Sequence, residues 1–105
     1  MLRFLLEAWP GGDQYIQQIP SLLVTGRCEC GCVTVYFGTG PADPDREPDR
    51  PLPVEASLVA ENGEPIGGVL IFARDEQITA LEAYSLEDAP ILAWPPGEQI
   101  LIRLS

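Results

Sequence analysis

The dipeptide Asn62-Gly63 lies between two runs of mostly apolar residues, and it constrains the fold of this chain more than any other feature. The two runs cover residues 53–60 and 65–74. Asn-Gly between such runs is the strongest short-range signal for a β-hairpin, because both residues adopt positive φ at low cost. The sequence therefore predicts an antiparallel hairpin in the middle of the chain.

A turn at Asn62-Gly63 also fixes the register of this hairpin. The pairs that then face each other are Leu58 with Gly67, Ala56 with Val69, and Val54 with Ile71. These residues form one continuous apolar face. The opposite face of the second strand carries Ile66, Leu70 and Phe72, and a strand that is apolar on both faces is typical of the centre of a sheet.

Shorter patterns flank the hairpin. Leu2, Leu5, Leu6 and Trp9 recur at helical spacing as far as Pro10-Gly11-Gly12, and Asp13 is a candidate N-cap for a second helical turn that Pro20 ends. Alternating apolar residues predict strands over 33–37, 78–84 and 100–104. We therefore expect an α+β fold, with two short N-terminal helices packed on an antiparallel β-meander of about four to six strands.

At 105 residues the chain has the length of a single domain, 1–105. Residues 41–53 contain five prolines and several aspartates, and this composition predicts an exposed loop.

The chain is strongly acidic, since 16 Asp and Glu against 6 arginines give a formal net charge of −10. This charge repels phosphate backbones and anionic lipid surfaces, so it disfavours binding to nucleic acid or to a membrane. It permits a basic protein partner, although acidity also serves solubility alone. The first residues lack the pattern of a secretory segment, and no apolar run is long enough to span a membrane, which predicts a cytoplasmic protein.

All three cysteines, Cys28, Cys30 and Cys32, lie within the stretch GRCECGC. Structural zinc takes four N or S ligands, whereas this chain has three thiols and no histidine. A thiolate metal site would need a carboxylate such as Glu29 or a second subunit of a homodimer, while Cu(I) accepts two or three thiolates. A redox pair of thiols, or a purely structural role, would also account for the cluster. The absence of histidine excludes Cys-His catalysis.

Gly31 favours the structural role, because it supplies the positive φ that a hairpin tip requires. With Cys30-Gly31 at the tip, the facing pairs are Cys28 with Val33, Gly26 with Val35, and Val24 with Phe37. One straight strand would instead place all three thiols on one face.

The remaining polar and aromatic residues give weaker indications. Paired carboxylates at Asp75-Glu76 and Glu87-Asp88 fall in predicted turns, where solvated charges are the rule. Glu82 interrupts an apolar strand, so it either faces outward or pairs with an arginine.

Three aromatic residues lie near the ends of elements and are candidates for a partner surface, unless they pack at the edge of the core: Trp9, Tyr84 and Trp94.

The order of these features resembles a group of small uncharacterised bacterial proteins from high-G+C genomes. The resemblance rests on Trp9-Pro10-Gly11, on the Cys-x-Cys-Gly-Cys motif after Gly26, and on the segment Leu81 to Ser85. It implies no activity and no cofactor. The sequence therefore favours a non-enzymatic interaction or regulatory module, immunity-like in type, that binds a basic protein. A thiolate metal-binding protein is the second hypothesis.

Overall fold

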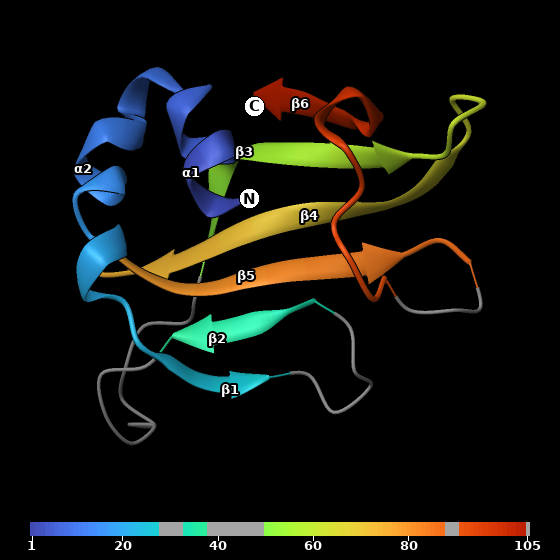
Figure 1. The fold of residues 1–105 in the computed structure, drawn as a ribbon. Helices are drawn as coiled ribbons and strands as arrows, with labels where there is room; N and C mark the ends of the chain where they lie inside the picture. The colour runs from blue at the N-terminus through green and yellow to red at the C-terminus, as the bar shows by residue number, and fades with distance from the viewer. Residues whose placement is uncertain (28–32, 38–49, 88–90, 105) are drawn as a thin grey trace.

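One antiparallel sheet of six strands forms the framework of the molecule, and the N-terminal helices pack at one end of it (Figure 1). The structure is a computed structural model that describes residues 1–27, 33–37, 50–87 and 91–104. The strand order is β1-β2-β5-β4-β3-β6. This arrangement confirms the expected α+β class.

The elements of the described residues are short at the N-terminus and longer in the centre. The helices are α1 (Leu2–Glu7) and α2 (Asp13–Ile16), and the 3₁₀ turns are η1 (Pro10–Gly12), η2 (Ile19–Ser21) and η3 (Gly97–Gln99). The strands are β1 (Val24–Arg27), β2 (Val35–Phe37), β3 (Arg50–Val59), β4 (Pro65–Arg74), β5 (Gln77–Ser85) and β6 (Ile100–Leu104).

The N-terminal helices follow the predicted pattern except at their junction. Leu5 and Leu6 are fully buried, as the helical spacing predicts. Asp13, however, is not an N-cap: it is the first residue of α2, and Gly12 occupies the cap position without a side-chain hydrogen bond. The reason is that η1 leads into α2 without an extended residue between them.

The β3–β4 hairpin has the predicted register over its middle part. Leu58 faces Gly67 and Ala56 faces Val69, as expected. The third expected pair, Val54 with Ile71, falls where the register shifts between Pro51 and Glu55. Both side chains are nevertheless fully buried in the core.

The turn of this hairpin is one residue longer than predicted. The amide of Ala60 donates to the carbonyl oxygen of Glu64 at 2.8 Å, so three residues lie in the loop. Of these, Gly63 has positive φ (87°), but Asn62 does not. The register then shifts between Leu58 and Val59, where the extra residue Ile66 of β4 forms a bulge and restores the predicted pairing.

The β1–β2 hairpin differs from the prediction by another bulge. Val24 faces Phe37 as expected, but Gly26 faces Tyr36 instead of Val35. The register shifts between Val24 and Gly26, because Thr25 is an extra residue on β1. The expected tip at Cys30-Gly31 lies outside the described residues.

The prediction of a loop over 41–53 is wrong at its end, because β3 begins at Arg50. Pro51 and Pro53 therefore belong to a strand that lies between β4 and β6. Pairing with β6 begins only at Val54, so both prolines lie where this side of β3 has no neighbouring strand in the described structure. A missing N–H is tolerated at such a position.

The core lies on one face of the sheet, beneath the helices and the segment between β5 and β6. Leu5 and Leu6 of α1 pack there with Val54, Leu58 and Ile71. In Figure 1 the segment before β6 crosses over β5 and β4 on the way to the edge of the sheet, and its residues Ile91 and Trp94 pack against the same core. None of the helices in the described ranges is long and apolar enough to cross a membrane.

Candidate functional site

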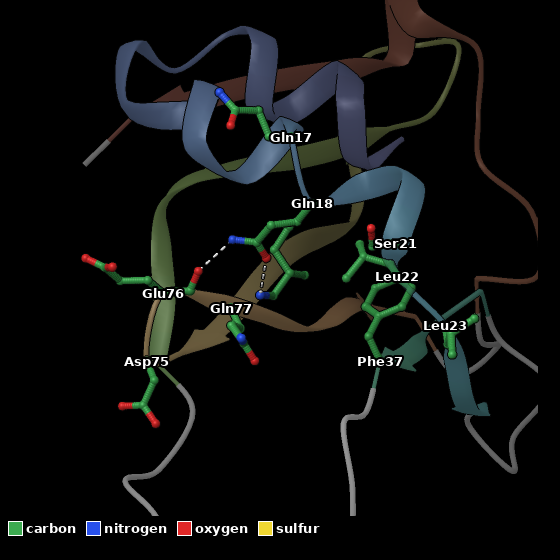
Figure 2. A pocket seen from close by; sticks show the side chains of 10 residues that line it. Gln17, Gln18, Ser21, Leu22, Leu23, Phe37, Asp75, Glu76 and Gln77 are labelled. Atoms are coloured by element: carbon green, nitrogen blue, oxygen red, sulfur yellow. Dashed lines mark hydrogen bonds between the residues drawn. The ribbon is translucent and has the colours of Figure 1, made fainter.

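A cleft of about 650 Å³ opens between η2 and the turn that connects β4 to β5. Figure 2 shows Asp75, Glu76 and Gln77 on one side of this cleft and Ser21, Leu22 and Phe37 on the other. The cleft is lined by Gln17, Gln18, Ser21, Leu22, Leu23, Phe37, Asp75, Glu76, Gln77 and Ile78. It therefore joins three segments that are far apart in the sequence.

The side-chain amide of Gln18 holds the two sides of the cleft together. Its Nε2 donates to the carbonyl oxygen of Glu76 at 2.6 Å, and its Oε1 accepts a hydrogen bond from the amide of Ile78 at 3.0 Å (Figure 2). One amide thus satisfies both a donor and an acceptor of the β4–β5 turn. This arrangement fixes the distance between η2 and the turn.

The β4–β5 turn has positive backbone φ angles at two residues that are not glycine. Asp75 and Glu76 have φ of 51° and 64°, the signs of a type I′ turn, which usually contains Asn or Gly. A non-glycine residue in this region costs about 1–2 kcal/mol. The hydrogen bonds from Gln18 hold the turn in this conformation.

The charged groups of the cleft lie at its mouth, and its apolar groups lie opposite them. Asp75 and Glu76 are exposed, and their carboxylates extend outward from the turn (Figure 2). Leu22 and Phe37 are half-buried, whereas Leu23 is 72% exposed. The lining of the cleft thus combines an apolar wall with two carboxylates, the hydroxyl of Ser21 and the side-chain amides of three glutamines.

A second, smaller cavity of about 170 Å³ meets the same turn. It is lined by Tyr15, Arg50, Pro51, Leu52, Ala73, Arg74, Asp75 and Glu76. The two turn residues are therefore shared by both hollows. Both residues are exposed, so their carboxylates are accessible.

The structure places the candidate site residues of the sequence in separate environments. Cys28, Cys30 and Cys32 lie outside the described residues, and the described ranges contain no group of three or more metal-ligating side chains. Trp9 is half-buried and stacks on Tyr15, with ring centroids 5.7 Å apart.

The other two aromatic candidates lie on opposite faces of the sheet. Trp94 is half-buried against the core. Tyr84 is 44% exposed, and it faces Gly68 on the other face. A Cβ at Gly68 would overlap the Tyr84 ring, so this ring lies flat over the glycine.

Sequence reasoning did not find the residues that form the cleft. Gln18 has no local signal, because its partners are 58 and 60 positions away. Asp75 and Glu76 were correctly expected to be solvated charges in a turn, and both are exposed. Their place at the mouth of a cleft depends on the packing of η2, which no pattern in the sequence indicates.

Glu82 is half-buried on the sheet face opposite the core. It forms no ion pair with an arginine of the described part of the chain. Glu82 therefore has the outward-facing position that was one of its two expected positions.

Searches of protein-family models, of curated proteins and of solved structures find no match to this chain.

Proposed function

We propose that this chain is a small acidic interaction module, regulatory or immunity-like in type, that binds a basic segment of a protein partner. The observation that carries the proposal is the composition of the cleft, in which an apolar wall stands opposite two exposed carboxylates. Leu22 and Phe37 form part of the wall, and Asp75 and Glu76 provide the carboxylates.

The charge of the molecule supports the proposal. The chain has a formal net charge of −10, so a basic partner is attracted from a distance and an acidic partner is repelled. Within the described residues, neither Asp75 nor Glu76 is neutralised by an ion pair with an arginine. Within that part of the chain, both exposed carboxylates are therefore open to a cation of a partner.

The shape of the cleft indicates which part of a partner fits. Its mouth suits a Lys or Arg side chain, and its wall suits an apolar side chain one or two residues away in an extended segment. Gln17 and Gln77 are exposed amides beside the cleft, and they can bond to the backbone of such a segment. An extended peptide that alternates arginine and leucine combines these features.

The experiment is a titration of the protein with such a peptide at low salt, followed by fluorescence anisotropy. We expect saturable binding, and the double variant Asp75→Asn/Glu76→Gln should weaken it by about fivefold, the effect of two exposed ion pairs. The matched control is Glu61→Gln/Glu64→Gln, which removes two exposed carboxylates from the other hairpin turn. It changes the net charge equally but does not alter the cleft.

Two results would count against the proposal. Equal loss of affinity in both double variants would mean that only net charge attracts the peptide. Unchanged affinity for a peptide whose arginines are replaced by neutral citrulline would mean that no cation is recognised. The peptide should also bind more weakly as the salt concentration rises, because the Debye length falls below about 10 Å above 0.1 M.

The second proposal, a thiolate metal site at Cys28, Cys30 and Cys32, concerns residues outside the described structure. Metal analysis of untagged protein, combined with thiol titration, decides it. A stoichiometric metal with protected thiols would support this metal site. A ratio near zero with three titratable thiols would exclude it.

A further inference from the structure

The sheet face opposite the core carries an ordered array of aromatic, aliphatic and acidic side chains. Cross-strand neighbours on one face of an antiparallel sheet lie next to each other, so the register gives the array directly. Three rows run across the strands: Tyr36–Ala80–Phe72–Pro51, Glu82–Leu70–Glu55–Arg103, and Tyr84–Gly68–Ser57–Leu101. We call this surface the outer face.

The helices do not cover the outer face. Leu5 and Leu6 of α1, and Trp94 of the crossing segment, all pack with the core on the opposite side. The exposure of the large apolar residues at the margins of the outer face agrees with this, since Tyr84 is 44% and Leu101 is 51% exposed. Tyr84 and Leu101 are therefore surface residues, whereas Ala80, nearer the centre of the outer face, is buried.

The middle row of the outer face has two carboxylates with an aliphatic residue between them. Glu82 and Glu55 flank Leu70, and all three are half-buried. Neither carboxylate forms an ion pair within the part of the chain that the structure describes, although Arg103 directly faces Glu55. The row therefore presents two negative charges that no ion pair within the described residues neutralises.

The spacing of this row matches a repeat of the α-helix. Neighbouring strands are about 4.8 Å apart, so the backbones of Glu82 and Glu55, two strands apart, are separated by about 10 Å. Residues i and i+7 of a helix are about 10.5 Å apart along its axis, and residue i+4 lies between them on the same side. A helix with arginines at i and i+7 and leucine at i+4 therefore matches Glu82, Glu55 and Leu70.

The aromatic residues beside this row fit the same occupant. Tyr84 is two residues from Glu82 on β5, and Phe72 is two residues from Leu70 on β4, so each ring borders the acidic row. An arginine side chain can pair with a carboxylate and stack on a neighbouring ring at once. A second copy of this chain fits poorly, because it brings another net charge of −10.

We infer that the outer face is a docking surface for an amphipathic basic helix of a partner protein, oriented across β5, β4 and β3. The inference rests on the proposed function, because it takes the partner to be basic, but it uses a surface separate from the cleft. A helix that crosses three strands buries roughly a few hundred Å² of each surface, which predicts weak, reversible binding.

The test is an NMR titration of the ¹⁵N-labelled full chain with a synthetic alanine-based helical peptide that has arginines at i and i+7 and leucine at i+4. The control peptide has the same composition, with the arginines at i and i+2, on opposite sides of the helix. We expect the first peptide to shift the amide signals of Leu70, Glu82 and Tyr84, and the control to shift them much less.

Variants of the protein complete the test. Glu55→Gln/Glu82→Gln should weaken binding of the first peptide by about fivefold, whereas the control variant Glu61→Gln/Glu64→Gln should leave it nearly unchanged. Circular dichroism of each variant verifies that the fold is retained.

The outcomes separate this inference from the proposed function. Shifts concentrated at residues 75–78 would overturn the docking of a helix on the outer face and would support the cleft as the basic site. Equal shifts with both helical peptides, or none with either at low salt, would also overturn it. The extended peptide that alternates arginine and leucine then tests the proposed function on its own.

Discussion

Gln18 accepts a hydrogen bond from the backbone amide of Ile78, a residue 60 positions later, at a distance of 3.0 Å. The same side chain donates to the carbonyl oxygen of Glu76, so it bonds to the backbone on either side of Gln77, where the turn enters β5. This contact joins the N-terminal helical segment to the sheet at the place where the cleft opens. The cleft therefore depends on a tertiary contact made by one amide.

Replacement of Gln18 by alanine should destabilise the protein by about 1–3 kcal/mol, because the amide of Ile78 is part-buried and loses its acceptor. Gln17→Ala is the matched control, since Gln17 is exposed and its side chain forms no hydrogen bond with the described residues. Urea unfolding of both variants measures the difference. Equal stabilities would show that the turn holds its conformation without Gln18.

Glycine at position 76 should stabilise the fold by about 0.5–1 kcal/mol, because it relieves the positive φ of Glu76 (64°). The gain is smaller than the strain, since glycine also raises the entropy of the unfolded chain. The reverse change, Gly63→Ala at φ 87°, should destabilise by a similar amount. If the proposed function holds, Glu76→Gly raises the melting temperature and at the same time weakens binding of the extended peptide. A loss of stability would contradict the assigned strain.

Two buried threonine hydroxyls should respond oppositely to replacement by the isosteric valine. The hydroxyl of Thr34 accepts from the amide of Ala83 at 2.9 Å and donates to its carbonyl oxygen at 3.3 Å. The hydroxyl of Thr79 is buried without a partner in the described part of the chain. Thr34→Val should therefore cost about 1–3 kcal/mol, whereas Thr79→Val should be neutral or stabilising. Thermal unfolding of the pair is sufficient, and a cost at Thr79 equal to that at Thr34 would refute the difference.

Adjacent glycines in β4 should differ in their tolerance of alanine. A Cβ at Gly67 would overlap the backbone carbonyl of Tyr84, which the sheet fixes in place, whereas at Gly68 it would meet only the end of the Tyr84 ring. Gly67→Ala should cost at least about 3 kcal/mol and Gly68→Ala about 1 kcal/mol, because a side chain can move aside. Unfolding in denaturant gives both values. Near-UV circular dichroism should report a displaced Tyr84 ring in Gly68→Ala, and an unchanged spectrum would mean that the ring does not lie over the glycine.

The strands were predictable where a period of two residues coincides with a clear turn. The predicted β4 segment, 65–74, agrees with Pro65–Arg74, and the pairing of Ala56 with Val69 follows from the same pattern. The bulges at Thr25 and Ile66 were not predictable. An extra residue in one strand depends on how both strands fit the sheet around them, and this information is not local.

Turn geometry shows the same limit. Asn62-Gly63 was expected to form a two-residue turn, yet its loop has three residues. The two-residue turn with positive φ at both positions occurs instead at Asp75-Glu76, where Glu76 is a residue that does not favour this conformation. The hydrogen bonds from Gln18 account for this difference, because a residue from another part of the chain holds the turn in a conformation that Glu76 by itself does not favour.

By itself the sequence determined the α+β class, the central hairpin and the acidity of the surface, because alternation of apolar residues and composition are local properties. Only the tertiary structure decided the order of the strands, the cleft at Asp75 and Glu76, and the row that places Glu82 and Glu55 on either side of Leu70. These features join residues that are distant in the chain. Their positions follow from which faces are buried against the helices, and that is settled only when the whole core packs.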